Sequence, residues 1–378
     1  MFTMYTRILF ALALGTFATG RSANLPSASG RACNNSPLLC SKPYDTVTYL
    51  GAHDSPYLRD ESTTFSSFGN QFFSTTVQLD AGVRMLQGQI HASSNKDTGQ
   101  RELHLCHTSC DLFDAGSLKD WLLEVRKWMD SNPNEVITIL LVNNGIKAKE
   151  LEDVYSQADV ARYGYVPPKI DTPPPPSNET ETTWPTLDEM INRNERLVSF
   201  ISPLVPDAQN APYLLDQWTF MWENPYLVTN PSNFTCLPDR PEDLPLQEAK
   251  ESGRLFMMNH FLYWQQAFGI QVPDIRFVNV TNAWEGPGSL GEHLMTCSGM
   301  VQRQPTFVLV DFFNVGPAIK AVDIFNKVDV PVGRKNVTSN VVPGGAGMFW
   351  GAARRSAEVS IWGVGFAVLA AVVLSMVL

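Results

Sequence analysis

Short apolar runs alternate with helical stretches between Thr46 and Phe313. The runs are bounded by Gly, Asn, Asp or Pro, which is typical of buried strands. The predicted strands are Thr46–Leu50, Val83–Ile90, Glu102–Leu105, Val136–Val142, Leu197–Ile201, Leu255–Met258 and Thr306–Val310. Apolar strands that alternate with amphipathic helices indicate parallel pairing beneath a helical cover.

One helix is well defined by its pattern. Apolar residues in the segment 118–129 fall at i, i+3, i+4 and i+7, which places them on one helical face. These residues are Leu118, Trp121, Leu122, Val125, Trp128 and Met129. Ser117 can cap the start of this helix, and Asn132-Pro133 ends it. We expect the helix to cover a sheet or barrel.

The strand pattern favours an α/β fold, a TIM-type (β/α)8 barrel over residues 33–330, with one strand hidden in the irregular middle of the chain. A doubly wound sheet is the alternative, but no Gly-x-Gly-x-x-Gly motif follows the first strand. The stretch Pro167–Pro185 includes four consecutive prolines, Pro173–Pro176, which exclude a helix or a central strand. We expect it to form an exposed loop inserted into the barrel.

Both ends of the chain carry apolar segments. Arg7 precedes the run Ile8–Ala18, and small residues follow, which predicts a secretory signal peptide at residues 1–20. Residues 359–378 carry no charge and are long enough to cross a bilayer as a helix. A cleaved GPI signal is favoured over a retained transmembrane helix, because Arg354 and Arg355 would lie outside the membrane. Residues 331–358 would then form a flexible stalk, and the protein would be held at the cell surface.

Composition supports an extracellular protein. Five Asn-x-Ser/Thr sequons predict N-glycosylation at Asn34, Asn178, Asn233, Asn279 and Asn336. The spacings of Cys33/Cys40 and Cys106/Cys110 suggest local disulfides, which leave Cys236 with Cys297, although other pairings are open. The net charge of -10 argues against nucleic acid as a partner. No cofactor and no structural zinc site are predicted.

Two histidines are the main candidates for chemistry. His53 directly follows the first predicted strand, and His107 ends the third. In a parallel barrel, the C-terminal ends of the strands carry the catalytic groups. Alternation along the third strand puts His107 on the same face as Leu103 and Leu105, and His104 on the other. A pair of histidines suits phosphodiester cleavage, in which one removes a proton and the other supplies one.

Other polar residues stand near these predicted strand ends. Asp54 and Asp311 can orient the histidines or stabilise their charge, and Asn143 can donate a hydrogen bond to a phosphate. The aromatic residues Trp218, Phe220 and Trp222 alternate, and core packing is their default interpretation.

Four segments together resemble the catalytic X domain of phosphatidylinositol-specific phospholipase C, and most closely the fungal branch of phospholipase-C-like phosphodiesterases. They are Gly51-Ala52-His53-Asp54-Ser55, Gly82-Val83-Arg84-Met85-Leu86-Gln87-Gly88-Gln89, Leu103-His104-Leu105-Cys106-His107, and Trp128 with Asn132-Pro133-Asn134-Glu135-Val136. The segment Thr306–Gly316 resembles the last barrel strand of the family. The resemblance implies a TIM-type barrel that cleaves phosphodiesters through attack by a neighbouring hydroxyl group. It also implies that His53 is the general base, that His107 is the general acid, and that Asp54 matches the aspartate after the first histidine.

The second strand departs from the family pattern. Gln87 and Gln89 stand where bacterial members have Asp-x-Arg and calcium-dependent members have acidic residues. An amide neither neutralises a phosphorane as Arg does nor gives calcium an anionic oxygen. Arg84 lies three residues before Gln87, so it faces the other side of the strand. We therefore expect a metal-independent, surface-anchored phosphodiesterase acting on a phospholipid or a glycosylated phosphoinositide. The alternative is an inactive barrel that serves as a cell-surface binding or structural protein.

Overall fold

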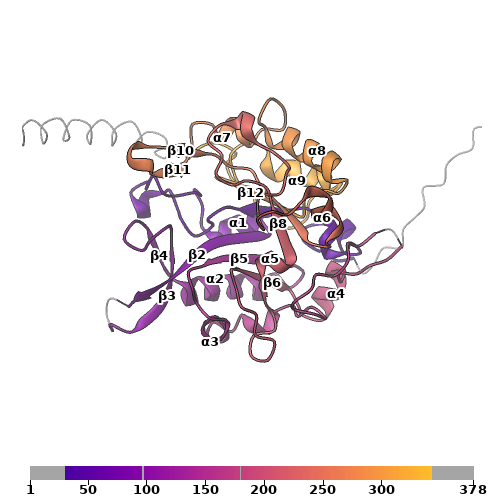
Figure 1. Cartoon of the computed structure of the whole chain (residues 1–378), viewed down its shortest axis with the longest axis horizontal. Coiled ribbons are helices and arrows are strands. Elements are labelled where there is room, and N and C mark those ends of the chain that lie inside the picture. Colours follow the sequence, from indigo (N-terminus) through magenta and orange to yellow (C-terminus); the bar gives the residue numbers. More distant parts are fainter. Residues whose placement is uncertain (1–29, 96–97, 179, 343–378) are drawn as a thin grey trace, which may run out of the picture.

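A curled, mostly parallel sheet forms the centre of the molecule (Figure 1). The computed structural model describes residues 30–95, 98–178 and 180–342. Eight parallel strands follow one another around the barrel: β1 (Tyr49–Ala52), β2 (Met85–Ser94), β5 (Ile137–Asn143), β6 (Leu197–Ser202), β7 (Leu214–Asp216), β8 (Met221–Glu223), β9 (Leu255–Asn259) and β12 (Phe307–Val310). The first strand, β1, pairs with both β2 and the last strand, β12. This order confirms the TIM-type α/β barrel and excludes the doubly wound sheet.

The barrel is irregular at one position. The strands β7 and β8 are consecutive in the chain, but within the described residues no pairing joins them. Each is only three residues long, and the four-residue helix α5 (Gln217–Phe220) connects them. Strands this short leave no readable periodicity, which explains why the sequence pattern did not reveal them. The residues Phe220 and Trp222 of this region are fully buried in the core.

The predicted strand Glu102–Leu105 is real, but its assignment to the barrel was wrong. It forms β3 (Arg101–Cys106), which pairs in an antiparallel manner with the outer half of β2 and with β4 (Asp114–Ser117). The ten-residue strand β2 pairs with β5 through its first six residues and then continues beyond the barrel to pair with β3. The other six predicted strands correspond to barrel strands.

Helices and short hairpins connect the strands. The α-helices, besides α5, are α1 (Thr75–Ala81), α2 (Leu118–Ser131), α3 (Ala148–Gln157), α4 (Leu187–Asn192), α6 (Leu246–Glu251), α7 (Val278–Thr281), α8 (Leu290–Val301) and α9 (Ala318–Phe325). The 3-10 helices are Pro37–Leu39, Tyr44–Thr46, Glu61–Thr63, Ala161–Tyr163, Pro231–Asn233 and Ala267–Gly269. The strands β10 (Tyr263–Gln265) and β11 (Gln271–Pro273) form a separate antiparallel hairpin after β9. Helix α2 buries the six apolar residues that its periodicity predicted, although the Ser117 side chain makes no capping hydrogen bond.

Alternation along the strands sorts the core into two layers. On β5, Ile137, Ile139 and Leu141 pack in the outer layer with helices such as α2. Leu140 on the same strand points into the barrel, where it packs with residues such as Phe200 and Phe307. Because both faces of the sheet are covered, the strands are continuous apolar runs in the sequence.

The six cysteines form three disulfides, Cys33–Cys40, Cys106–Cys110 and Cys236–Cys297. These are the pairs that the spacing suggested. Four of the five sequon asparagines, at positions 178, 233, 279 and 336, are exposed. The fifth, Asn34, is 4% exposed and exchanges hydrogen bonds with the backbone of Val136. A glycan on Asn34 would have to displace these contacts, so glycosylation there stays a prediction that the folded structure does not favour.

The segment after the barrel is not a free stalk over its first part. The amide of Val332 donates to the Asn35 carbonyl oxygen at 2.8 Å, and Arg334 pairs with Asp323 at 2.7 Å. Further along, the Gly316 amide donates to the carbonyl oxygen of residue 339. The prediction of a stalk is therefore wrong for residues 331–342, which run along the barrel. The rest of the predicted stalk, the signal peptide and the C-terminal apolar segment lie outside the described residues. Within the described part, none of the helices combines the length and the apolar character that crossing a bilayer requires.

The Pro-rich loop packs on the barrel through part of its length. The amide of Ser177 donates to Asp45 at 2.7 Å, and Trp184 is fully buried against Tyr44. Tyr44 and Asp45 precede β1, so these contacts lie at the end of the barrel where the strands begin. The loop is thus anchored at the opposite end of the barrel from the C-terminal ends of the strands.

Candidate active site

His53 is held in place by the residues that follow β12. Because Ala52 of β1 is in register with Val310 of β12, His53 and Asp311 emerge side by side. The Nδ1 atom of His53 lies 2.8 Å from Oδ1 of Asp311, and a carboxylate there can only accept, so Nδ1 carries the proton. Asn70 donates to the same Asp311 oxygen at 2.9 Å. The ring of Phe261 stacks on His53 with centroids 3.7 Å apart. This arrangement directs Nε2 of His53 away from Asp311.

His107 reaches the same place through the hairpin of β2 and β3. Ile90 is paired with Leu105, so the antiparallel strand returns toward the end of the barrel and carries His107 with it. Its Nδ1 atom donates to the Phe68 carbonyl oxygen at 2.8 Å, and its ring stacks on Tyr57 with centroids 5.0 Å apart. His107 therefore does not lie on a barrel strand, but the hairpin of β2 and β3 brings it to the mouth of the barrel.

A tight turn supplies the Phe68 carbonyl oxygen and the Asn70 amide. A Cβ atom at Gly69 would lie 2.4 Å from the Leu58 carbonyl oxygen, so only glycine fits between these two segments. The segment 68–70 thus positions one group beside each histidine. The sequence analysis did not identify Asn70 as a site residue, because an asparagine in a loop carries no distinctive signal.

Asp54 lies between the two histidines. Its Oδ2 atom is 3.5 Å from Nε2 of His53 and 3.3 Å from Nε2 of His107. The side-chain Nε2 of Gln89 donates to both carboxylate oxygens at 3.3 Å, and Gln87 accepts from the Asp54 backbone amide at 2.6 Å. The Asp54 backbone has a positive φ of 49°, a conformation that Asp tolerates better than most residues. Both glutamines line the cavity, and both position Asp54.

The charges around His53 favour its protonated form. Burial by itself lowers the pKa of His53, but the carboxylates of Asp54 and Asp311, and more distantly Glu223, outweigh burial and raise it. A histidine with a raised pKa is a stronger base than an ordinary imidazole, provided that it is deprotonated at the working pH.

A cavity of about 680 Å³ opens over these groups and contains both histidines in its wall. The cavity is also lined by residues that the sequence did not single out: Glu223, Tyr226, Arg240, Asn259, Phe261 and Tyr263. Glu223 ends β8 and is completely buried, and burial raises its pKa although Arg240 beside it acts in the other direction. The Nε atom of Arg240 donates to Glu223 at 2.6 Å. This wall combines a fixed ion pair with aromatic rings.

One predicted position takes another role. Asn143 lines the cavity, but its amide donates to the carbonyl oxygens of Ile146 and Pro203 and accepts from the Ile146 amide. Its hydrogen-bonding groups are thus used in a turn, so the predicted phosphate contact is corrected. Arg84 directly precedes β2, and it is buried in an ion pair with Glu135. It therefore lies at the far end of the barrel from the histidines.

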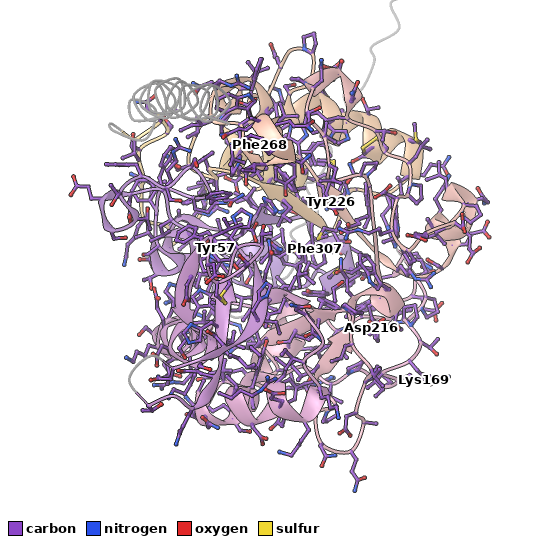
Figure 2. All side chains as sticks on the ribbon, turned by 60° about the vertical axis from the view of Figure 1, so that its left-hand side comes forward. Tyr57, Lys169, Asp216, Tyr226, Phe268 and Phe307 are labelled. Atoms are coloured by element: carbon purple, nitrogen blue, oxygen red, sulfur yellow. A yellow bond between two sulfur atoms is a disulfide. The ribbon has the colours of Figure 1, made fainter. Side chains whose placement is uncertain are left out.

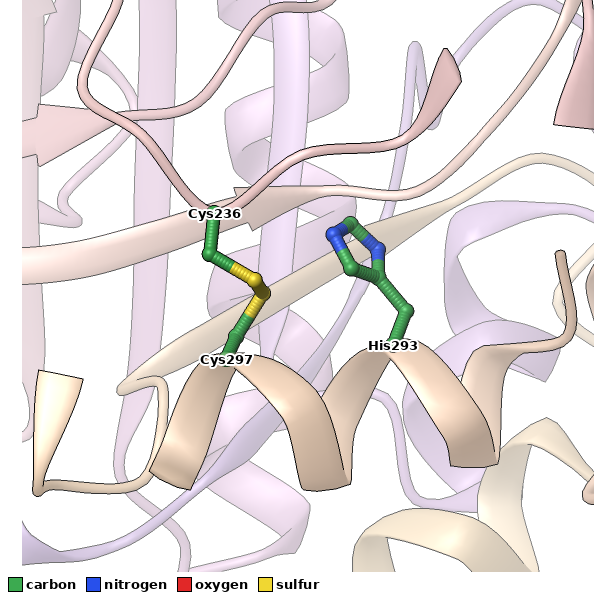
Figure 3. A group of neighbouring side chains, drawn as sticks. All are labelled: Cys236, His293 and Cys297. Atoms are coloured by element: carbon green, nitrogen blue, oxygen red, sulfur yellow. A yellow bond between two sulfur atoms is a disulfide. The ribbon is translucent and has the colours of Figure 1, made fainter. Parts of the chain in front are cut away.

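Two further histidines form a buried cluster behind the cavity wall. His260 follows β9, and its Nδ1 atom lies 2.9 Å from Nδ1 of His293 on α8. Figure 3 shows His293 beside the Cys236–Cys297 disulfide, which ties the loop after β8 to α8. The two sulfur atoms are bonded to each other at 2.04 Å, so they are not thiolate ligands for a metal. Both histidines are buried, and their contacts with each other and with backbone oxygens are structural.

The carboxylates of the cavity do not fit a calcium ion. Calcium requires six to eight oxygen ligands, mostly anionic or carbonyl oxygens. Asp54 and Asp311 are engaged with histidines, and Glu223 is engaged with Arg240. The second barrel strand contributes the neutral amides of Gln87 and Gln89 instead. These side chains therefore do not form a calcium site.

Known proteins are similar to this chain over most of its length. The family model described as PI-PLC X 1 matches residues 39–326. PI-PLC X domain-containing protein 1 of Arthroderma benhamiae is 35% identical over 82% of this chain and 94% of that protein. An uncharacterized secreted protein of the same fungus is 32% identical over 79% of this chain, which spans 64% of that protein. A solved mutant of phosphatidylinositol-specific phospholipase C from Staphylococcus aureus has 14% identity and a TM-score of 0.46, covering 78% of this chain and 95% of that one.

Proposed function

The chain belongs to the PI-PLC X family, and on that premise we propose that it cleaves a lipid phosphodiester as a phospholipase C does. The observation that supports this most directly is the convergence of two histidine Nε2 atoms on one oxygen of Asp54, inside one cavity. Each histidine has its Nδ1 atom committed to a fixed acceptor, so both Nε2 atoms are available to exchange protons with a substrate.

The proposed reaction is an intramolecular displacement at phosphorus. Nε2 of His53, in its neutral form, removes the proton from a headgroup hydroxyl next to the phosphate. That oxygen forms a bond to phosphorus while the bond from phosphorus to the lipid oxygen breaks. Nε2–H of His107, in its cationic form, gives its proton to the departing lipid alkoxide. The Asp311 carboxylate stabilises the His53 imidazolium that forms, in the same way as the acidic member of other catalytic triads.

The cavity wall supports a headgroup that carries hydroxyl groups. The Glu223–Arg240 pair offers acceptors and donors together, and Tyr226 and Tyr263 supply flat apolar surfaces beside them. At the mouth, Phe268 lies at the tip of the β10–β11 hairpin (Figure 2), and its side chain is completely exposed. A phospholipid or a glycosylated phosphoinositide at a membrane surface satisfies both features, because its headgroup enters the cavity while its apolar part stays near the rim.

We also propose that the protein acts outside the cell. A relative at 32% identity is named a secreted protein, and the exposed sequons and three disulfides suit the secretory pathway. Attachment through GPI predicts that an exogenous inositol-lipid phospholipase C releases the protein from cells into the medium. Mass spectrometry that finds Leu378 at the mature C-terminus would exclude this anchor.

The alternative is an inactive barrel that binds a surface ligand, and it is favoured by the neutral Gln89 beside the presumed phosphate position. The test is turnover of purified protein on vesicles that contain phosphatidylinositol, other phosphodiester lipids or glycosylated phosphoinositides. We expect a water-soluble phosphorylated headgroup to appear with at least one of them. No product from any vesicle, with a folded protein, would favour the binding protein.

A further inference from the structure

Arg240 is the one lysine or arginine that lines the cavity in the part of the chain that the structure describes. It lies in the long connection from β8 to α6, but its backbone is fixed to the barrel. The Glu223 amide donates to the Arg240 carbonyl oxygen at 2.9 Å, and the Asp239 amide donates to the Glu223 carbonyl oxygen at 2.8 Å. The loop thus returns to the end of β8 and places an arginine over the mouth of the barrel.

The guanidinium group of Arg240 is held on two sides. Its Nε atom donates to Glu223, and its Nη2 atom pairs with the same carboxylate. Its carbon centre lies 4.2 Å from the ring centroid of Tyr226 and 5.1 Å from that of Trp218. Among the described residues, no group accepts a hydrogen bond from Nη1, and the side chain is 38% exposed. The group is therefore fixed in position and retains unused N–H donors.

Neutralising Glu223 does not account for all of this arrangement. Glu223 also accepts from Gln217 at 3.2 Å, so its buried carboxylate has a second partner. One edge of a guanidinium satisfies a carboxylate, whereas the fork as a whole has five donors. The donors that face away from Glu223 can bind another anion, and planar guanidinium groups are well matched to phosphate oxygens.

The Arg240 group and the histidine pair belong to one neighbourhood. Tyr263 packs edge-on against His53, with centroids 6.3 Å apart, and its amide donates to the Val228 carbonyl oxygen at 2.8 Å. The stretch 226–228, which also contains the aromatic partner of Arg240, is thereby attached to the residues around His53. Arg240 therefore lines the same cavity as the two histidines and Gln89.

We propose that Arg240 forms an anion subsite that binds a phosphate oxygen of the substrate and supplies the positive charge that Gln89 lacks. The proposal rests on the proposed phosphodiesterase function. The phosphate has two possible sources, the reacting diester or a second phosphate on the headgroup, and the guanidinium chemistry is the same for both.

Binding of inorganic phosphate, measured by calorimetry on the full chain, tests the subsite without turnover. Glu223→Gln removes the competing charge and should tighten phosphate binding. The double variant Arg240→Gln/Glu223→Gln keeps a neutral, hydrogen-bonded pair in the same place, which protects the fold, and should weaken binding at least about tenfold. Equal phosphate affinity of the wild type and the double variant, or weaker binding after Glu223→Gln, would overturn the proposal.

Turnover distinguishes the two sources of phosphate. If Arg240 contacts the reacting diester, the double variant should lose kcat/KM at least about tenfold on every lipid substrate. If it contacts a headgroup phosphate, the loss should appear in KM and only for phosphorylated headgroups. His53→Ala is the control for the reaction itself, because it should abolish turnover and leave phosphate binding intact. A chain that binds phosphate through Arg240 but turns over no lipid would keep the subsite and contradict the proposed function instead.

Discussion

Gln89 donates its side-chain amide to both oxygens of the Asp54 carboxylate, at 3.3 Å each. The group beside the Asp54 carboxylate is therefore a neutral amide. Because the amide carries no charge, the negative charge of Asp54 acts mainly on the two histidines. The site is thus organised around the Asp54 carboxylate and its contacts with imidazole groups.

The histidine pair can be tested by truncation. His53→Ala and His107→Ala should each reduce turnover by ~10² to 10⁴-fold, the typical contribution of general acid–base catalysis. His104→Ala is a matched control from the same hairpin, because His104 points away from the cavity and binds Asp114 at 2.9 Å. Circular dichroism should show that all three variants are folded. Undiminished turnover of either cavity variant would contradict the mechanism.

The pH profile tests the role of Asp54. His53 must be neutral to act as a base, so activity should fall as the pH drops through its raised pKa. Asp54→Asn removes one of the charges that raise this pKa, so the acidic limb of kcat/KM should move to lower pH. The measurement is kcat/KM from about pH 4 to about pH 9, a range that spans the ordinary pKa of histidine. An acidic limb that stays in place would show that Asp54 does not act on His53.

Gln89 tests the cost of the missing arginine. If Arg240 binds a headgroup phosphate and not the reacting diester, wild-type activity on phosphatidylinositol should be weak, because a lost charged donor to the transition state costs roughly 3–4 kcal/mol. Gln89→Arg should raise this activity if the inserted guanidinium reaches both Asp54 and the phosphate. Gln89→Met is the control for loss of the amide alone. Strong wild-type activity would instead indicate that another residue, for which Arg240 is the candidate, replaces the arginine.

Chelation tests the proposed independence from metal. The cavity carboxylates are engaged with His53, His107 and Arg240, so EDTA should leave the turnover rate unchanged. The assay is turnover on vesicles before and after dialysis against the chelator. Restoration of a lost activity by calcium would contradict the prediction.

The buried histidine pair predicts a loss of stability in acid. Burial holds the pKa of His260 well below its ordinary value, with His293 as a second cause, and burial lowers the pKa of His293 to about 4. Unfolded histidines titrate near ~6.5, so below that pH the unfolded chain binds more protons than the folded one. The free energy of unfolding should therefore fall as the pH drops from about 6.5 toward 4, by up to ~1.4 kcal/mol per pH unit and proton.

His293→Gln should reduce the change of the free energy of unfolding with pH between about pH 4 and about pH 6.5. Above neutral pH, where these histidines are neutral in both states, the variant should change this slope less. Urea unfolding at several pH values measures the free energy directly. If the variant keeps the full slope of the wild type between pH 4 and 6.5, the cluster is not its source.

The sequence by itself determined the local features of this protein. Continuous apolar runs predicted six of the barrel strands because both faces of the sheet are buried, and the period of α2 predicted its buried face. The strand β3 ends at Cys106, one residue before His107, so alternation along the strand does not by itself place this side chain in the cavity wall. The order and spacing of four short segments, of which the motif around His53 is the first, identified the family.

Only the tertiary structure decided how distant segments meet. The barrel places β12 beside β1, which brings Asp311 to His53, and the hairpin from β2 returns His107 to the mouth. The chain also folds the loop after β8 back onto Glu223, which puts Arg240 into the cavity wall. No sequence pattern predicts this, because Arg240 acquires its position through contacts with residues that have no fixed spacing from it. The same holds for Asn34 and Asn143, whose polar side chains are used by backbone partners that only the folded chain brings within reach.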